Sequence, residues 1–256
     1  MIALFDYDSL LYQCVYRIVS IGQIKFMFLT GDTKDQIREY IISETIEKVK
    51  SRTYQILNAI EETGIYLEDV EYYLTNCIRN FRLDIYEPYK ANRKSNKWVK
   101  AIRQRLIDSE FAMAHESLEA DDLIAIRAEQ LREINWEFII ISIDKDLAQI
   151  HGIHYNYYPL YDESGFIGFK GLYVMSEFES QKHFAKQMLI GDSTDNIKGC
   201  RKIGVVKAEK ALQNCTTKRQ LIFAVYRQYH LIFRKDNEYE YWSELAINYK
   251  LLKLGL

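Results

Sequence analysis

Residues 1–12 of the chain are MIALFDYDSLLY, an apolar run that is followed closely by two aspartates. The run has the composition of a buried strand, and Asp6 stands at its end. Carboxylates this close to a buried strand are costly to desolvate unless something compensates their charge. A metal ion or a phosphate-handling site would do so. The stretch therefore predicts a first, buried strand with a chemical site at its end.

The composition of the 256 residues is that of a globular protein. Hydrophobic residues make up 48% of the chain, enough to bury a sizeable core and too much for a disordered protein. The length fits one domain with a substantial appendage, or two small domains. The net charge is only -2, from 34 basic and 36 acidic residues, so local clusters of charge must indicate the partner.

The spacing of the cysteines and the length of the apolar runs indicate the cellular compartment of the protein. Cys14, Cys77, Cys200 and Cys215 form neither a CxxC pair nor a spacing typical of zinc, so we expect reduced thiols. No apolar run reaches the roughly 18 residues of a membrane span, and two aspartates interrupt the apolar start. We expect a cytoplasmic protein that does not enter a membrane.

Strand and helix patterns alternate along the first part of the chain. Segments 1–6, 70–76 and 138–143 are rich in β-branched and aromatic residues, as strands are. Helical spacing of apolar residues predicts a long helix from a cap at Asp32 to a stop at Gly64, and another at about 118–133. Strands separated by helices predict an α/β fold. Its sheet should be mostly parallel, with helices on both faces and sites at the carboxyl ends of the strands.

The pattern changes after the third strand. Residues 154–161 and 165–169 predict an edge strand or a hairpin around Gly165. From Glu177 onward the pattern is helical, and GCRKIG, residues 199–204, is expected to form a tight turn between two helices.

Acidic residues gather in short stretches at the ends of predicted strands or in predicted helices. They are Asp6; Glu119, Asp121 and Asp122; Asp144 and Asp146; and Asp192 and Asp195. Acids three apart on a helix, or two apart on a strand, point the same way. Such a cluster cannot stay ionised without compensation, because like charges raise one another's pKa. Oxygen ligands without histidine or cysteine favour Mg²⁺ or Mn²⁺ over zinc.

Two other interpretations of these acids exist. Each acid alone fits a helix cap or a solvated surface charge, and only their joint occurrence points to a site. FDYDS and GDSTDN also resemble the aspartate motifs of haloacid-dehalogenase-type phosphatases, which use magnesium. In that family the later motif closes a strand, whereas here it follows a predicted helix, FAKQMLIGD, and the LEADD and basic segments would be left unused.

Together, the motifs resemble those of the 5′-nuclease family, which includes phage 5′-3′ exonucleases, flap endonucleases and the nuclease domain of bacterial DNA polymerase I. The shared motifs, between residue 2 and about residue 212, are FDYDSLLY, YKANR, LEADD, SIDKDL and LIGDSTDNIKGCRKIG. The resemblance implies a PIN-like core over residues 1–175, with a short basic arch at about 85–115. It also implies a helix-hairpin-helix DNA-binding region with C-terminal helices over 176–256, and two-metal phosphodiester hydrolysis.

The resemblance also implies roles for individual residues. All eight acids become metal ligands. The resemblance also assigns four of these acids to catalysis: Asp6, Glu119, Asp121 and Asp144. Two basic residues, Lys90 and Arg93, join them and stabilise charge on the scissile phosphate. Tyr89 is expected to stack on an unpaired base. Asp8 falls where the family usually has a neutral residue, so we treat it as a neighbour of the site.

All charged residues in YKANRKSNKWVKAIRQR, residues 89–105, are basic. A solvated helix face would usually mix signs, so the run suggests a path for phosphates. Trp98, Ile102 and Leu106 form an apolar stripe that favours helix packing over base stacking. A second basic cluster surrounds GCRKIG, where amides at a helix start can receive a phosphate. The expected DNA-binding residues are Tyr89, Lys90, Arg93, Lys94, Lys97, Lys198, Gly199, Arg201, Lys202, Gly204 and Lys207.

Three features depart from the family pattern. The usual acid near the end of the second strand is replaced by Thr75 or Asn76, which predicts a weaker first metal site. Many members carry an arginine where this chain has Gln13. The segment between YKANR and LEADD is short, which predicts an abbreviated arch.

The sequence thus predicts a 5′-3′ exonuclease or flap endonuclease that uses two Mg²⁺ or Mn²⁺ ions, with K⁺ at the helix-hairpin-helix implied by resemblance. We expect a monomer that acts on DNA with 5′ ends, flaps or nicks, and on RNA in hybrids. Two alternatives stay open: the phosphatase, and a catalytically weakened DNA-binding module. The histidines of HGIH, His151 and His154, receive no role.

Overall fold

Five strands form one sheet in the computed structural model, which describes residues 1–15, 27, 31, 33–94, 96–163, 165–233 and 238–255. The strands are β1 (Ile2–Asp6), β2 (Asp69–Tyr73), β3 (Phe138–Ile141), β4 (Gly152–Asp162) and β5 (Gly165–Met175). Their order is β2-β1-β3-β4-β5, and only the β4–β5 pair among them is antiparallel. The mostly parallel α/β sheet expected from the sequence is confirmed.

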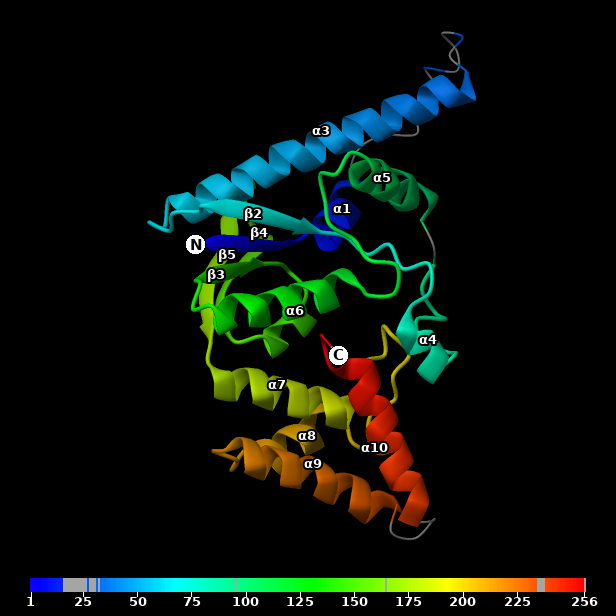
Figure 1. Cartoon of the computed structure of the whole chain (residues 1–256), viewed down its shortest axis with the longest axis vertical. Helices are drawn as coiled ribbons and strands as arrows, with labels where there is room; N and C mark the ends of the chain where they lie inside the picture. The colour runs from blue at the N-terminus through cyan, green and yellow to red at the C-terminus, as the bar shows by residue number, and fades with distance from the viewer. Residues whose placement is uncertain are drawn as a thin grey trace.

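The central strand β1 is buried on both faces. Ala3 and Phe5 belong to one core, which α1 (Tyr7–Val15), α3 (Lys34–Glu61) and α5 (Lys97–Asp108) cover. Leu4 points to the other core, which α6 (Ala120–Glu133) covers (Figure 1). A strand with two buried faces needs apolar residues at successive positions, which explains the run at residues 2–5.

The long helix α3 begins at a different cap from the expected one. Thr33 is its N-cap, and a reciprocal pair of hydrogen bonds links Thr33 with Gln36. Asp32, the expected cap, lies outside the described residues. Gly64, with a φ of 88°, follows the helix end at the expected position.

Several strand boundaries differ from the sequence-based expectation, among them the end of β3, which lies at Ile141 instead of residue 143. β2 stops at Tyr73 because the next amide, of Leu74, donates to the Met113 carbonyl instead of continuing the ladder with β1. β4 and β5 form the expected hairpin around Gly165 but are longer than predicted. Residues 171–175 of β5 pair with residues 152–156 of β4, part of which also pairs with β3 on the other side.

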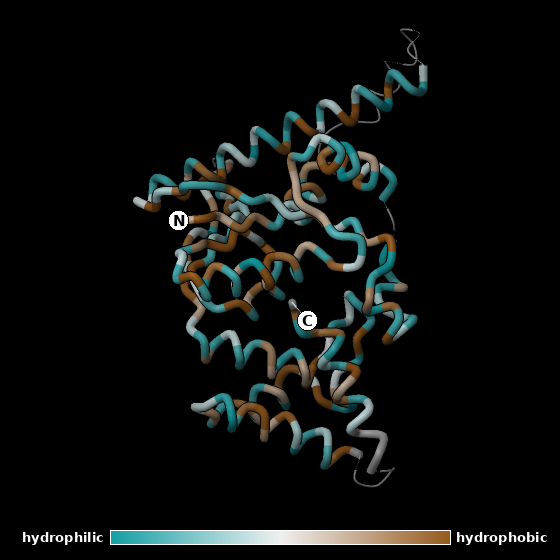
Figure 2. Tube along the Cα trace, in the orientation of Figure 1, coloured by the Kyte–Doolittle hydropathy of each residue, from teal (hydrophilic) through white to brown (hydrophobic). Residues whose placement is uncertain are grey.

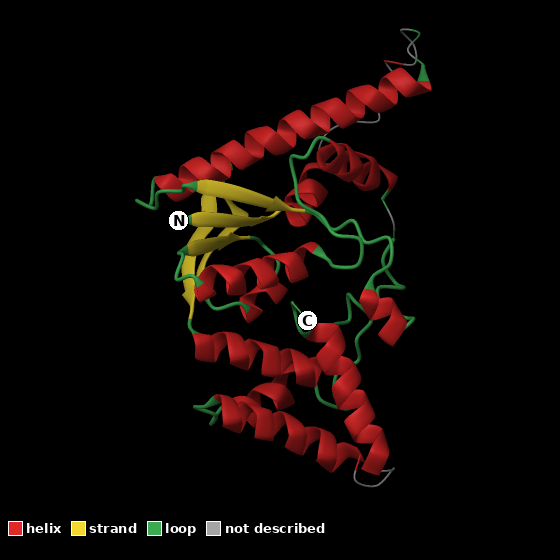
Figure 3. Ribbon diagram, viewed as in Figure 1, coloured by secondary structure: helices red, strands yellow, loops and turns green. Residues whose placement is uncertain are grey.

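The chain from Glu177 onward adds a helical layer below the sheet (Figure 3). It contains α7 (Glu177–Ile190), α8 (Val205–Leu212), α9 (Lys218–Phe233) and α10 (Glu238–Leu252), which share a core that includes Leu189, Leu212 and Leu221. Residues 191–204 join α7 to α8, so GCRKIG is the last part of a longer connection. The division into domains at residue 175 and the helix-hairpin-helix stay predictions. Among the described helices, none is long and apolar enough to cross a membrane.

Candidate metal centre

The carboxyl ends of β1 and β3 place two acids side by side. Asp6 ends β1, is 5% exposed, and accepts hydrogen bonds of 2.7 Å from the hydroxyls of Ser9 and Ser142. Burial, the negative charge of Asp144 after β3, and that of Asp8 together raise the pKa of Asp6 to about 7. The hydroxyl groups orient this carboxylate without neutralising it.

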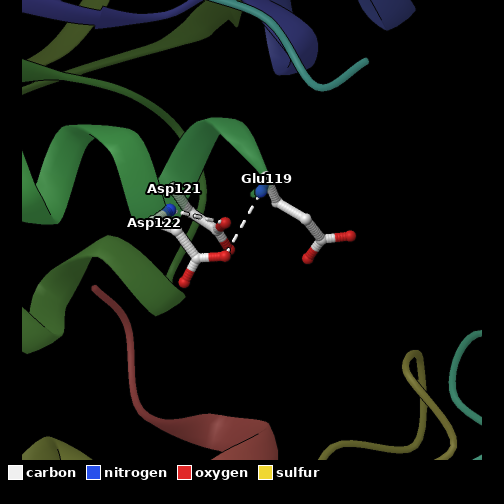
Figure 4. A group of neighbouring side chains, drawn as sticks. All are labelled: Glu119, Asp121 and Asp122. Atoms are coloured by element: carbon white, nitrogen blue, oxygen red, sulfur yellow. Dashed lines mark hydrogen bonds between the residues drawn. The ribbon is translucent and has the colours of Figure 1, made fainter. Parts of the chain in front are cut away.

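Three more acids come from the start of α6. Glu119 is the N-cap, and Asp121 and Asp122 lie in the first turn, where the helix dipole favours negative charge (Figure 4). One carboxylate oxygen from each of the three lies within 4.8 Å of the others, a spacing that suits one cation. The fold therefore brings this LEADD motif to the same edge of the sheet as Asp6.

Basic side chains from the YKANR segment reach these acids. Lys90 Nζ donates to Glu119 Oε1 at 2.5 Å and lies 3.5 Å from Asp195 Oδ2, and Arg93 pairs with Asp195. Although burial opposes the shift, Lys90 lowers the pKa of Glu119. The buried Tyr89 donates its hydroxyl to Glu119 at 2.8 Å, so here it holds an acid instead of presenting a ring for base stacking.

The loop after α7 supplies the last two predicted acids. Asp192 accepts a hydrogen bond of 2.9 Å from Lys145 Nζ and one of 2.7 Å from the Thr194 amide. Asp121, Asp146, Asp192 and Asp195 line one pocket at the junction of the sheet and the helical layer. The structure therefore brings acids from all the predicted stretches to one region.

Four of the acids have no cationic partner within 4.0 Å among the described residues: Asp6, Asp121, Asp144 and Asp146. Burial, Glu119 and Asp122 raise the pKa of Asp121 well above its ordinary value. Burial and Asp144 raise the pKa of Asp146 to about 7, although Gln187 donates to Asp146 at 2.6 Å. Uncompensated carboxylate oxygens without a histidine or cysteine suit a hard divalent cation such as Mg²⁺.

Asp122 has a different environment from the other acids. It is fully buried, and its two oxygens accept hydrogen bonds of 2.5 and 2.7 Å from Arg82, which is 1% exposed. Arg82 also donates to the carbonyls of Leu251 and Lys253, and the Gly255 amide donates to Asp122. The sequence does not predict this role of Arg82, because nothing in the local pattern around it distinguishes it from a surface arginine.

Segment 251–255 is a second feature that the sequence did not indicate. Leu251, Leu252 and Leu254 line the acidic pocket beside Asp121 and Asp146. Leu254 belongs to the core under α6. One wall of the site is thus built by residues more than a hundred positions away from Asp121 and Asp146 in sequence.

Asp8 and Thr75 lie together at the end of β2, where the family pattern has an acid. The Thr75 amide donates to Asp8 at 2.9 Å, and Arg103 of α5 donates to the other oxygen of Asp8 at 2.7 Å. The Thr75 hydroxyl accepts from the Ala120 amide at 2.9 Å. Thr75 therefore supports the first turn of α6, and Asp8 joins α5 to the sheet edge.

The remaining predicted basic residues are spread over two exposed surfaces. Lys94 and Lys97 lie beside Arg93, with Lys97 Nζ 5.2 Å from the centre of the Trp98 ring. Val99, Ile102 and Leu106 form the buried stripe of α5, so the expected packing role of this helix is confirmed, with Val99 as its first fully buried member.

The second surface surrounds the turn before α8. Lys198, Arg201, Lys202 and Lys207 are exposed there. Arg201 pairs with Glu244 of α10 at 2.5 Å, and Lys207 Nζ donates to the Lys202 carbonyl at 3.0 Å.

Comparison with known proteins shows what the chain is related to. The family model of the 5′-3′ exonuclease N-terminal, resolvase-like domain matches residues 74–167. A flap endonuclease Xni of Shewanella amazonensis is 28% identical, over 68% of this chain and 70% of that protein. A 5′-3′ exonuclease of Mycoplasmopsis pulmonis is 32% identical, over 52% of this chain and 47% of that protein. The chain is therefore similar in sequence to 5′-nucleases over part of its length.

Two further comparisons define the extent of the likeness. The chain spans only 14% of the DNA polymerase I of Rhizobium leguminosarum, to which it is 31% identical. The solved structure of T5 5′-exonuclease with divalent metal ions (zinc) covers 99% of each chain, at 12% identity and a TM-score of 0.51. That structure shares the fold.

Two glycines close the loop that carries Asp192 and Asp195. Gly191 and Gly199 have φ of 76° and 64°, and their backbones approach so closely that a Cβ on Gly199 would lie 2.3 Å from the Gly191 nitrogen. Since the obstacle is backbone, no side-chain rotation can relieve it.

We expect Gly199→Ala to lower the free energy of unfolding by about 2 to 4 kcal/mol, from left-handed strain and overlap together. Gly204→Ala is the control, because a Cβ there meets nothing within 4 Å and φ is not positive. It should cost less than about 1 kcal/mol. Urea denaturation measures both, and equal costs would contradict the proposed close packing.

Arg82→Met tests the buried pair. It leaves Asp122 charged, buried and unpaired, so we expect a loss of about 3 to 5 kcal/mol in the free energy of unfolding. Arg79→Met removes a comparable but exposed pair with Asp84, whose side chains are 78% and 55% exposed. That control should change stability by less than about 1 kcal/mol. A similar small change for both would show that Arg82 is not structurally important.

Asp6→Asn tests the raised pKa. A carboxyl with a folded-state pKa of about 7 and an ordinary value of 3.8 stabilises the fold at low pH, and loses that contribution as pH rises towards 7. Asparagine does not titrate, so without metal the variant should gain stability relative to the wild type between about pH 4 and pH 7. The gain should be on the order of a few kcal/mol. A difference that is constant with pH in urea denaturation would contradict the shift.

Proposed function

We propose that the protein is a metal-dependent 5′-3′ exonuclease and structure-specific flap endonuclease that hydrolyses phosphodiester bonds near the 5′ ends of DNA. The observation that carries the proposal is the group of uncompensated carboxylates, among them Asp6, Asp121 and Asp146, close to Lys90 and Arg93. Negative oxygens can hold cations, and the adjacent basic groups can hold phosphate. The names of the relatives support the same activity.

The eight acids would hold two Mg²⁺ or Mn²⁺ ions. Such ions supply a nucleophilic water at neutral pH and charge stabilisation at the leaving oxygen. Asp6 is oriented by two hydroxyl groups and Asp146 by Gln187, so these carboxylates are held in place before a ligand arrives. We assign Asp122 a supporting part, because Arg82 already engages both its oxygens.

Lys90 and Arg93 would bind the scissile phosphate. Their side chains are 22% and 49% exposed, so both can meet a ligand from solvent, whereas the fully buried Arg82 cannot. A positive group placed where charge develops in the transition state contributes a factor of about 10² to 10³ in rate. Lys90 and Arg93 now neutralise Glu119 and Asp195, and they would share that charge with the phosphate.

Duplex DNA would lie across the exposed basic surfaces. Lys94 and Lys97 belong to a short basic arch, and Lys198, Arg201, Lys202 and Lys207 surround Gly199 and Gly204 in a helix-hairpin-helix that could hold K⁺. Contacts of this kind go to phosphate, so binding should prefer DNA structure to sequence and should weaken with salt. Flaps, nicks and free 5′ ends are the proposed substrates, with RNA accepted in hybrids and the protein acting as a monomer.

The decisive experiment combines cleavage and binding. Wild-type protein and an Asp144→Ala, Asp146→Ala variant are incubated with 5′-flap, nicked and blunt duplexes in Mg²⁺, Mn²⁺ or EDTA. We expect metal-dependent cutting by the wild type and a loss of at least about a hundredfold in the variant, since several kcal/mol of charge stabilisation disappears. A Glu129→Ala, Glu133→Ala variant removes two acids from the far end of α6 and should cut normally.

Each alternative gives a different result in this assay. DNA binding without cutting in either metal would indicate a DNA-binding module, which the threonine at position 75 motivates. Hydrolysis of small phosphate esters without DNA binding would indicate the phosphatase. Cutting that survives in the Asp144→Ala, Asp146→Ala variant would overturn the site assignment.

A further inference from the structure

A groove of about 650 Å³ lies between α7, α9 and α10, in the helical layer that Figure 1 shows below the sheet. Apolar side chains from one face of each helix line it, among them Phe184, Met188, Leu221, Val225, Leu245 and Tyr249. Their spacing of three or four residues is that of helices packing around a shared partner. The three helices thus form the walls of a site that a further apolar segment could fill.

The groove is open to solvent along α9 and α10. Ile222 and Phe223 are 60% and 63% exposed, and Trp242 and Tyr249 are 52% and 41% exposed. Figure 2 shows apolar positions recurring along α9. Large apolar side chains that line one concave surface are more typical of a binding site than isolated exposed residues are.

Charge at the groove is of one sign. Lys218, Arg219 and Lys253 line it, and the described lining residues include no acid. Lys218 lies at the start of α9 and Lys253 directly after α10, with its Nζ 5.8 Å from the centre of the Phe184 ring. Glu129, which does not line the groove, offsets part of the repulsion that Lys218 and Arg132 exert on Lys253. The three basic side chains that line the groove attract an incoming carboxylate.

Helix α7 separates the groove from the acidic site. Phe184, Ala185 and Met188 line the groove, whereas Gln187 lines the acidic pocket and donates to Asp146. An occupant of the groove would therefore leave the carboxylates open to their own ligands.

We propose that this groove is a docking site for a short acidic segment of a partner protein that carries aromatic or large aliphatic side chains. The apolar side chains fill the space between the helices, and the carboxylates meet Lys218, Arg219 and Lys253. A volume of about 650 Å³ matches that of a ligand pocket able to take several large side chains. An amphipathic segment in a helical groove is a common mode of peptide recognition.

The proposal can be tested without knowing the partner. A phage-displayed library of random twelve-residue peptides is selected on the full-length protein, and enriched peptides are synthesised with a fluorescent label for anisotropy. We expect enriched sequences to combine Asp or Glu with Trp, Phe, Leu or Ile, and their binding to weaken with added salt. Ile222→Glu and Lys218→Glu should each weaken binding at least tenfold, because each places a negative charge at the groove.

Tyr66→Glu is the matched control, since Tyr66 is 76% exposed and is not part of the groove. It should bind the peptides as the wild type does, and circular dichroism checks that all variants are folded. Failure to enrich any acidic, apolar sequence would overturn the proposal, and so would binding that Ile222→Glu leaves unchanged.

Two other results would overturn the proposal. If dodecanoate binds, Ile222→Glu abolishes its binding and no peptide binds, the groove is a lipid site. If sedimentation shows a dimer that Ile222→Glu dissociates, the groove is a contact between two copies of this chain. The inference does not depend on nuclease activity, because none of these measurements uses cleavage.

Discussion

Buried negative charge at the carboxyl edge of the sheet is the constraint on which the rest of the structure depends. A carboxylate that leaves water needs a cation, hydrogen-bond donors or a proton. Lys90 and Lys145 satisfy this need for Glu119 and Asp192. Among the described residues, only hydroxyl groups donate hydrogen bonds to the Asp6 carboxylate, and its pKa stays raised, a condition that a divalent ion would relieve. The same imbalance that costs folding free energy therefore prepares the site for a metal.

The pair of Arg82 and Asp122 connects this site to distant parts of the chain. Through the Leu251 carbonyl, Arg82 joins the short helix α4 (Phe81–Ile85) to the end of α10, and through Asp122 it joins both to the start of α6. A fully buried ion pair is costly to assemble and more costly to break. In this protein the ion pair holds the first turn of α6 in place, and so it sets the direction in which Glu119 and Asp121 point. Helix α7 lies between the two sites: one of its faces contacts the acids, and the other lines the groove.

Much of the fold could be predicted because burial leaves a local pattern. The runs at residues 2–5 and 138–141 are continuously apolar because both strands are covered on two faces, and α6 has helical spacing with acids in its first turn. The end of β2 was misjudged, because the bond between Leu74 and Met113 that diverts the chain has no signature near residue 74. The resemblance predicts that Tyr89 stacks on an unpaired base, yet the side chain is buried and its hydroxyl donates to the buried Glu119.

The sequence by itself determined the α/β class, the order of the acidic motifs and the resemblance to 5′-nucleases, because these depend on neighbours in the chain and on residue types. Only the tertiary structure decided which acids are neutralised by cations and which are left for a metal. It also decided that residues 251–255 build a wall of the site and that three helices leave a groove between them. These features rest on contacts such as the one between Arg82 and Leu251, 169 positions apart. Desolvation and charge pairing at such contacts depend on distance in space, which no local pattern of residues encodes.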